Sequence, residues 1–295
     1  MKRNIFYYLL LITVIFTACG TPKQTIDYQQ LAMTSYEGGA YQQSIDQWNT
    51  YIQEQETKVL EVNPKAYAEI AKAQFAMEQY EKAEQNFDKA RHKEYADADM
   101  YVMMVERYRM IDNLSKELTA LEYYKDHFAD QKDSTPMRNR LFETYMEADN
   151  YEAVTETWQK MDNESKSEEV YVQLYFDLNK ELEQTEKCDE LAEQLLVFNG
   201  ENEEALIWLA KKYYNRAENR YQTQMDKYNK NRSNKQYNIL LKQLDIVTAD
   251  FKKSLKYFEP LWNMEDGKKY ASYMANIYGR FDDKKKSQYY KSFIK

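Results

Sequence analysis

Apolar residues along this chain recur at the spacing of amphipathic helices. Between Tyr67 and Ala90, large and small apolar residues fall at i, i+3, i+4 and i+7, so they lie on one face of a helix with 3.6 residues per turn. Similar stripes return along nearly the whole chain, which has only 6 Gly and 4 Pro in 295 residues. We therefore predict helices throughout. The four clearest units are carried by Tyr28, Leu31, Ala32 and Trp48, by Tyr67, Ile70, Ala71 and Phe87, by Tyr101, Met104, Val105 and Leu121, and by Leu141, Phe142, Tyr145 and Trp158.

A large residue also recurs at a nearly constant interval. The series Trp48, Phe87, Leu121, Trp158, Leu195, Phe258 and Tyr290 has separations of 39, 34, 37, 37, 63 and 32. All but one lie near the length of about 34 that is typical of tetratricopeptide (TPR) repeats, and the alternation of large and small residues resembles that family. The resemblance implies an all-α, TPR-type helical-repeat solenoid of about seven helix pairs, in which each pair buries its apolar face against its neighbours.

One stretch leaves a second interpretation open. Val170, Val172, Leu174, Phe176 and Leu178 alternate with other residues, as in a half-buried strand. We predict a helix here because the segments on both sides have the helical period.

Two prolines predict helix starts. In Asn63-Pro64 and in Thr135-Pro136 a capping side chain precedes a proline. Proline is favoured at the first position of a helix, where its missing N–H is not needed. Both pairs therefore predict a helix that begins at the proline.

The separation of 63 marks an insertion of about 29 residues relative to a 34-residue repeat. Apolar residues continue at intervals of seven on both sides of the polar stretch 229–235, which is typical of two helices that keep one seam in contact. We predict one helix pair lengthened into a protruding helical hairpin, with Pro260 kinking or ending its second helix. The two heptad series are Ile207, Tyr214, Tyr221 and Tyr228, and Tyr237, Leu244, Phe251 and Phe258.

The predicted hairpin tip is basic. From 227 to 235 the chain carries Lys227, Lys230, Arg232 and Lys235 and no acidic residue. A solvated turn accounts for such a segment. The alternative is a contact for anionic groups, on a partner protein or on lipid headgroups.

The N-terminus has the pattern of an export signal. Lys2 and Arg3 precede an apolar run over 5–16, which is followed by Thr17-Ala18-Cys19-Gly20. This segment resembles the signal and lipobox of bacterial lipoproteins. The resemblance implies cleavage before Cys19, lipid attachment to Cys19, and, with Gly20 rather than Asp, sorting to the outer membrane of a two-membrane bacterium. We expect the protein to face the periplasm.

These features divide the chain into five parts. We predict a signal peptide at 1–18, a short tether at 19–27, TPR-like repeats at 28–203, the repeat with the extended hairpin at 204–262, and a C-terminal TPR-like repeat at 263–295.

The net charge of the chain limits the kinds of partner it can bind, and its cysteines have simple interpretations. The chain has 41 basic and 49 acidic residues. Loss of the two basic residues of the signal leaves 39 against 49, a net charge of −10, which disfavours nucleic acid as a partner. Besides Cys19 only Cys188 is present, and we interpret it as a buried apolar residue.

No pattern of catalytic chemistry stands out. The only histidines are His92 and His127, and the sequence has no zinc-type spacing, phosphate-binding glycine loop or serine elbow. A glycosidase that uses a pair of carboxylates needs no sequence motif, and nothing in this sequence marks such a pair. We nevertheless predict no catalytic residue, no metal site and no cofactor.

The first helices of the predicted pairs indicate how a partner would bind. In TPR proteins that grip a C-terminal carboxylate, Lys and Asn recur at groove positions, and that pattern is missing here. Aromatic and Met side chains are enriched at protein interfaces, although some of these simply pack. The groove residues that we predict to contact a protein partner are Met33, Tyr36, Lys72, Phe75, Val102, Arg109 and Met146.

Together these inferences predict a lipid-anchored TPR scaffold that binds a protein in the bacterial envelope. In size, anchor and repeats the chain resembles the TPR lipoprotein subunit of the outer-membrane β-barrel assembly machine, although the inserted hairpin departs from that pattern. The alternative is a surface-exposed nutrient- or glycan-binding lipoprotein. Its relatives are longer and rich in loops, which this sequence lacks.

Overall fold

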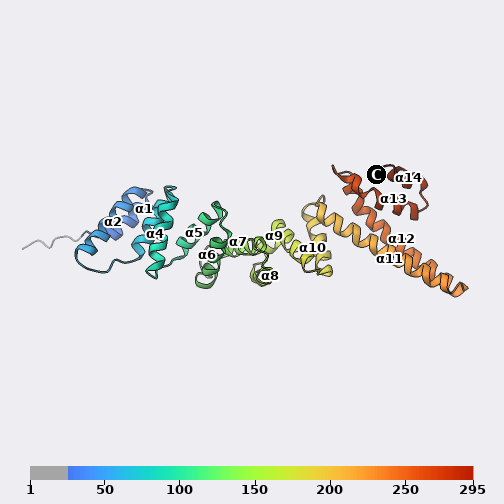
Figure 1. The fold of residues 1–295 in the computed structure, drawn as a ribbon, viewed down its shortest axis with the longest axis horizontal. Helices are drawn as coiled ribbons and strands as arrows, with labels where there is room; N and C mark the ends of the chain where they lie inside the picture. Colours follow the sequence, from blue (N-terminus) through green and yellow to red (C-terminus); the bar gives the residue numbers. More distant parts are fainter. Residues whose placement is uncertain (1–25, 295) are drawn as a thin grey trace, which may run out of the picture. The chain divides into compact units, whose positions relative to one another are not determined.

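The computed structural model describes residues 26–294, so the predicted signal peptide, Cys19 and all but the last two residues of the tether lie outside the described residues. In the described part, fourteen α-helices and two short 3₁₀ helices follow one another without a strand (Figure 1). The prediction of an all-α helical-repeat fold with about seven helix pairs is confirmed. Within 26–294, no helix combines the length and the apolar character needed to cross a membrane.

The chain divides into two compact units, the first of which ends at Met103. Its helices are α1 (Tyr28–Glu37), α2 (Tyr41–Thr57), α3 (Lys65–Ala76), α4 (Tyr80–His92) and the first part of α5 (Ala98–Met110). Helix α1 packs on α2, and α3 packs on both α2 and α4. Trp48 fills the core of this unit at 1% exposure, and Ala32, Ala66 and Ala73, all fully buried, allow the helix backbones to approach closely.

The second unit holds the remaining helices. They are the end of α5, α6 (Leu114–His127), α7 (Ser134–Glu147), α8 (Tyr151–Lys160), η1 (Ser165–Ser167), α9 (Glu169–Glu181), α10 (Thr185–Phe198), α11 (Glu203–Lys230), α12 (Asn234–Trp262), η2 (Gly267–Tyr270), α13 (Ala271–Arg280) and α14 (Lys284–Lys291). One core cluster in this unit centres on Phe176, and another on Phe251 and Phe258, all fully buried.

Six of the helix pairs share one turn. After the first helix ends, the second residue beyond it adopts a positive φ of 51–75°. Its N–H and the next N–H donate to carbonyls in the last turn of the helix, which is the Schellman arrangement. Only the first of these turns has glycine at this position, and the others have acidic residues. The six residues are Gly39, Glu78, Asp112, Asp149, Glu183 and Asp282.

The long hairpin is present, and one recurring hydrogen bond measures its insertion. In two ordinary pairs a buried serine donates to an alanine carbonyl 12 residues earlier, from Ser44 to Ala32 and from Ser287 to Ala275. In the long pair Ser254 makes the same bond to Ala210 across 44 residues, at 2.8 Å. The difference, 44 minus 12, places 32 residues in the extension, close to the 29 expected from sequence.

Four predictions about single helices can be compared with the structure. The helix predicted to begin at Pro64 begins one residue later, at Lys65, with Pro64 as its N-cap residue. The stretch that also fits a strand is helix α9, and Pro260 lies in the last turn of α12, two residues before that helix ends. Asn63 Oδ1 accepts the Lys65 N–H at the start of α3. The prediction that α7 begins at the Thr135-Pro136 pair is wrong, because α7 begins at Ser134, which leaves Pro136 inside the first turn, where proline is also tolerated.

Candidate partner-binding surface

Four of the predicted groove residues occupy one structural position. Tyr36, Phe75, Arg109 and Met146 are each the second-to-last residue of the first helix of a pair, directly before the shared turn. The carbonyl of each accepts the N–H of the positive-φ residue of that turn. The turn therefore fixes the backbone at this position in the same way four times, and only the side chain changes.

The two aromatic members are held by rings from the second helix. Tyr36 meets Tyr41 edge-to-face with ring centroids 5.4 Å apart, and Phe75 meets Tyr80 in the same way at 5.1 Å. Edge-to-face pairs contribute about 0.5–1.5 kcal/mol beyond burial. Tyr36 and Phe75 are half-buried, so each ring is anchored on one side and open on the other.

Lys72 lies in the same unit, but its side chain is buried and paired with two carboxylates. It is 6% exposed, and its Nζ lies 3.1 Å from Glu69 Oε1 and 2.8 Å from Asp97 Oδ2. Burial lowers the pKa of Lys72, but the two carboxylates outweigh burial and the net direction is upward. The structure therefore supports a structural role for Lys72 rather than an exposed groove contact.

Asp97 joins this ion pair to the start of α5. Its Oδ1 accepts the Met100 N–H at 2.8 Å, and its Oδ2 accepts the Tyr95 hydroxyl at 2.9 Å. Burial raises the pKa of Asp97, but the charge and hydrogen bond of Lys72, with the Met100 N–H and Tyr95, lower it overall. The cluster therefore links α3 to the N-terminus of α5.

The other predicted contacts are only partly available. Met33 is half-buried and packs against the core cluster around Trp48, so part of it serves packing. Val102 and Met146 are half-buried, and Arg109 is exposed. Of these three, only Arg109 lines a depression described below.

An acidic depression of about 580 Å³ lies in the second unit. It forms where α5, α7, the segment between α8 and α9, and α9 come together. Of the predicted contacts it includes Arg109. We call this site the acidic depression, and it is lined by Arg109, Thr135, Pro136, Asn139, Arg140, Glu143, Asp162, Glu164, Ser165, Glu168 and Tyr171.

A chain of hydrogen bonds organises one wall of the acidic depression. Asp162 Oδ1 accepts the Ser165 N–H at 2.8 Å, and Asp162 Oδ2 accepts the Ser165 hydroxyl at 3.2 Å. The Ser165 oxygen in turn accepts Asn139 Nδ2 at 2.9 Å. The hydrogen bond from the Ser165 N–H is the main cause that lowers the pKa of Asp162. Asn139 Oδ1 is buried and has no hydrogen-bond partner among residues 26–294.

Arg140, which also lines the acidic depression, is held by neighbouring carboxylates. Its Nε and one terminal nitrogen contact the two oxygens of Glu117, which is 2% exposed, at 2.5 and 3.0 Å. Its other terminal nitrogen reaches Glu143 and Glu147 at 2.8 and 2.9 Å. Tyr171 donates to Glu143 at 3.3 Å, and burial together with Glu143 raises the pKa of Tyr171 to about 12. The positive charge of Arg140 is thus satisfied within the fold.

A second depression was missed by sequence reasoning. It has a volume of about 590 Å³ and lies against α11, with walls from the end of α9 and the start of α10. Trp208 is held there by a hydrogen bond from Nε1 to Asp189, at 2.9 Å, and by the ring of Phe176. A signal was present in the sequence, because Trp208 is followed by Lys211 and Lys212 on the same helix.

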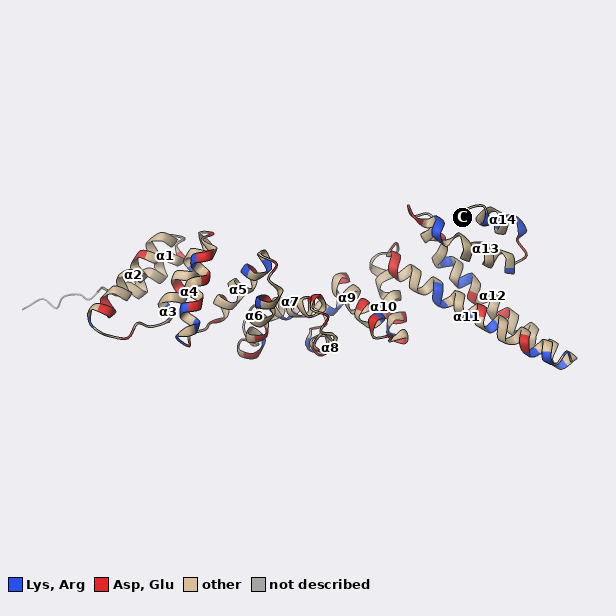
Figure 2. Ribbon diagram, viewed as in Figure 1, with Lys and Arg blue, Asp and Glu red and all other residues tan. Residues whose placement is uncertain are grey.

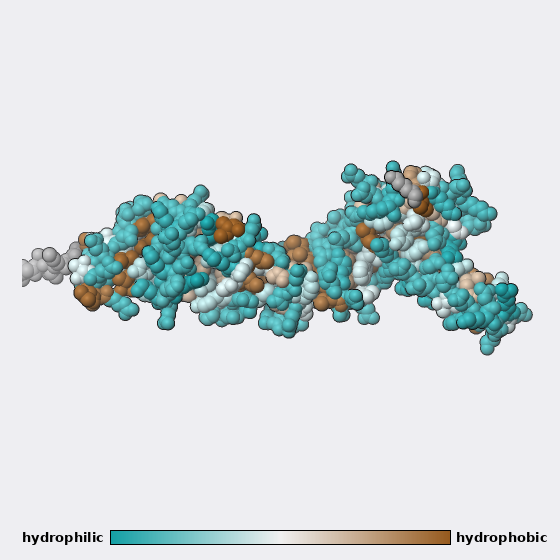
Figure 3. Space-filling view, viewed as in Figure 1, coloured by the Kyte–Doolittle hydropathy of each residue, from teal (hydrophilic) through white to brown (hydrophobic). Residues whose placement is uncertain are grey.

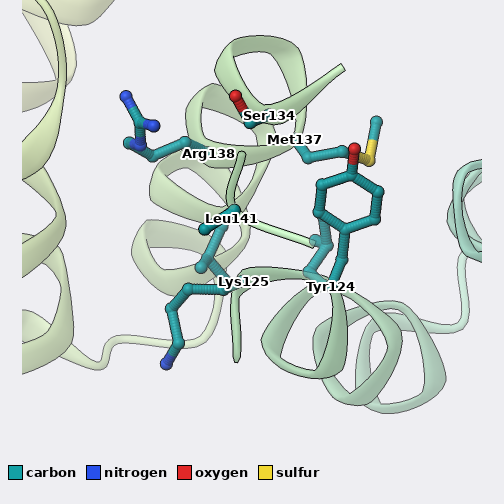
Figure 4. Close-up of a pocket in the computed structure, with 8 residues that line it drawn as sticks. Tyr124, Lys125, Ser134, Met137, Arg138 and Leu141 are labelled. Carbon is teal, nitrogen blue, oxygen red and sulfur yellow. The ribbon is translucent and has the colours of Figure 1, made fainter. Parts of the chain in front are cut away.

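A third cavity is too small for a partner side chain. Figure 4 shows Tyr124 and Lys125 from α6 beside Met137, Arg138 and Leu141 from α7. Its volume of about 40 Å³ suits a water molecule rather than a ligand.

The basic hairpin tip is displayed as predicted, at the far end of the α11–α12 hairpin (Figure 2). Lys227, Lys230, Arg232 and Lys235 are all exposed, and in the described structure none of them forms an ion pair. The surface there is mainly hydrophilic (Figure 3). Exposed apolar side chains of α12 follow the tip, among them Ile239 and Leu241 at 39% and 44% exposure.

The remaining candidates for chemistry have structural surroundings. Cys188 is fully buried, as predicted, and burial raises the pKa of its thiol. His92 and His127 are exposed, and each Nδ1 lies near a backbone carbonyl one turn earlier in its own helix. Among residues 26–294, no group of three His, Cys, Asp or Glu side chains is placed to hold a metal ion.

No model of a known protein family matches this chain, and no curated protein matches it. Solved structures are similar at low identity. YrrB, described as a TPR protein with an unusual peptide-binding site, is 14% identical over 63% of this chain and 90% of that chain, with a TM-score of 0.47. A putative protein-binding protein from Bacteroides ovatus is 14% identical over 64% and 99%, also with a TM-score of 0.47.

A longer match has lower similarity. The C-terminal part of a TPR repeat-containing protein from Cytophaga hutchinsonii is 13% identical over 90% of this chain and 93% of that chain, with a TM-score of 0.43.

Proposed function

We propose that the protein is a helical-repeat scaffold that binds a segment of a protein partner on the first helices of its pairs. The observation that carries the proposal is the acidic depression, where side chains from three helices and a connecting segment converge around a buried acceptor without a partner. Its volume of about 580 Å³ falls in the range of ligand-binding clefts.

The first unit supports the same function by a different means. Tyr36 and Phe75 each have one ring edge or face packed on the second helix, so little side-chain entropy is lost when a partner covers the open side. Aromatic residues are enriched at protein interfaces, and Tyr is among the residue types that contribute most to binding energy there.

Binding is tested by crosslinking and capture from native membranes. We expect the double variant Tyr36→Ser, Phe75→Ser to lose most of the captured partner while its circular dichroism spectrum stays helical. Val197→Ser is the matched control, because Val197 is 84% exposed but lies on α10, a second helix. Full capture by the folded double variant would refute partner binding through these rings.

For location, we propose a lipid anchor at Cys19 in the outer membrane with the repeats in the periplasm, where the scaffold takes part in outer-membrane protein assembly. The support is the sequence segment Thr17-Ala18-Cys19-Gly20 behind an apolar run. Labelled palmitate should enter the wild-type protein and not Cys19→Ala. Cleavage of the protein by protease added to whole cells would place it outside the cell instead.

A further inference from the structure

Asn139 lines the acidic depression and holds a buried acceptor that has no partner among the described residues. The Ser165 hydroxyl proton is used by Asp162, so the Ser165 oxygen accepts from Asn139 Nδ2. This assignment leaves Asn139 Oδ1 as the free atom, and Asn139 is 8% exposed. Leaving a buried acceptor without a donor costs about 1–3 kcal/mol. An N–H group of a ligand in the acidic depression would remove that cost.

The charges that line the acidic depression are unbalanced. Its lining has two cationic residues and four acidic ones. Arg140 is already paired with Glu117, Glu143 and Glu147, so it offers no free charge. Glu164 and Glu168 are exposed carboxylates for which the described structure shows no ion pair, and Arg109 is the remaining cation.

Glu168 is the N-cap residue of α9 and lines the acidic depression. It is near enough to Tyr171 to contribute to the raised pKa of that residue. Asp162, at the same wall as Asn139, has both oxygens already used as acceptors by Ser165. A carboxylate has room for about two acceptor bonds at each oxygen, so Asp162 retains capacity for another donor.

From these groups we propose that the acidic depression binds a basic side chain of the partner, an Arg or Lys, with Asn139 Oδ1, Glu164 and Glu168 as acceptors. This inference rests on the proposed function, since the ligand is part of the bound protein segment. Arg fits best because its planar guanidinium carries five donors for acceptors in a fixed array. Since the acidic residues outnumber Arg109, the one lining cation without an ion pair in the described structure, the free C-terminal carboxylate of a partner would be disfavoured here.

The test uses two short peptides and the folded protein. The probes are acetylated, amidated Gly-Ser-Arg-Ser-Gly and the same peptide with citrulline, which keeps the shape of Arg without its charge. We expect the Arg peptide to shift the NMR side-chain amide signal of Asn139 and to bind at least tenfold more tightly than the citrulline peptide, measured by titration. Equal affinity for the two peptides would overturn the inference.

Two variants decide which atoms act. Glu164→Gln, Glu168→Gln should weaken the Arg peptide about tenfold. Glu169→Gln should leave its affinity unchanged, because Glu169 is also acidic but does not line the acidic depression. Asn139→Leu should also weaken binding, and if it fails to fold, the glutamine pair still decides. Unchanged affinity in the glutamine pair contradicts the proposal.

Failure of the inference is separable from failure of the proposed function. If the natural partner is captured equally by wild type and by Glu164→Gln, Glu168→Gln, but not by Tyr36→Ser, Phe75→Ser, the scaffold function stands and the basic side chain is refuted. If the Arg peptide binds as expected but no variant changes partner capture, the site stands and its role in partner binding is refuted.

Discussion

Arg140 on α7 donates hydrogen bonds to both carboxylate oxygens of Glu117 on α6, and Glu117 is only 2% exposed. This pair joins the second helix of one repeat to the first helix of the next. A bidentate pair has a fixed geometry as well as an attraction, so it sets how the two helices meet. The same Arg140 forms a wall of the acidic depression, which makes the site dependent on the packing of neighbouring repeats.

Arg140→Met should destabilise the protein by about 3–5 kcal/mol, because it leaves the Glu117 charge buried without a partner. Urea denaturation followed by circular dichroism measures the loss. Arg91→Met is the control: Arg91 pairs with Asp88 at the surface, where both side chains are more than a third exposed, and its loss should cost less than about 1 kcal/mol. Equal costs for the two variants would contradict the structural role of Arg140.

Acid should weaken the link between α3 and α5. Since the folded state lowers the pKa of Asp97, its contribution to stability is fully present above its ordinary pKa of about 3.9 and is lost as pH falls through the lower folded value. Asp97→Asn removes the contribution of this ionised carboxylate to stability. The stability difference between wild type and Asp97→Asn should therefore shrink between about pH 5 and pH 2. A difference that is constant over this range in urea titrations would show that Asp97 is not held ionised by Lys72.

Glycine at the shared turn should stabilise the protein. Glu78 holds a φ of 59°, which costs a non-glycine residue about 1–2 kcal/mol. Replacing Glu78 with glycine removes this cost, but the greater freedom of glycine in the unfolded chain offsets part of the stabilisation. Glu78→Gly should therefore gain about 0.5–1 kcal/mol, read as a higher midpoint in urea.

Gly39 provides the reverse case. It has a φ of 75°, and no heavy atom lies within 4 Å of the position that a Cβ would take, so Gly39→Ala tests backbone strain without a clash. It should destabilise by roughly 1 kcal/mol. A gain in Gly39→Ala, or a loss in Glu78→Gly, would disagree with the shared turn geometry.

The basic hairpin tip should matter for binding and not for stability. Reversing Lys227, Lys230, Arg232 and Lys235 to Glu should weaken capture of the natural partner. The thermal midpoint should stay within about 2 °C, because these side chains are exposed and make no ion pair in the described structure. Unchanged capture would show that the tip is a solvated turn with no part in binding.

The sequence located the long hairpin well for a physical reason. Each of its helices carries apolar residues every seven positions along one seam, as in the half-buried Tyr214 and Tyr221. Such a pattern depends only on neighbours within the same helix. The lengths of α11 and α12, 28 and 29 residues, follow from it.

Lys72 shows what the sequence does not reveal. Its position on the first helix of a pair predicts a groove contact, whereas its charge is paired with Asp97, which is 25 residues away and directly precedes α5. The acidic turn residues show the same limit. A left-handed residue after a helix is usually glycine, but the shared turn has acidic residues such as Glu78 and Asp112 there. Only the backbone conformation therefore reveals the turn.

The sequence by itself therefore determined the all-α helical repeat, the period of the pairs and the place of the extended arm, because these depend on local periodicity. The tertiary structure alone decided the acidic depression, where Asn139 meets Ser165 from 26 residues away and Arg140 meets Glu117 from 23. Whether a polar side chain is satisfied, buried or free depends on contacts between helices. No spacing along one helix specifies those contacts.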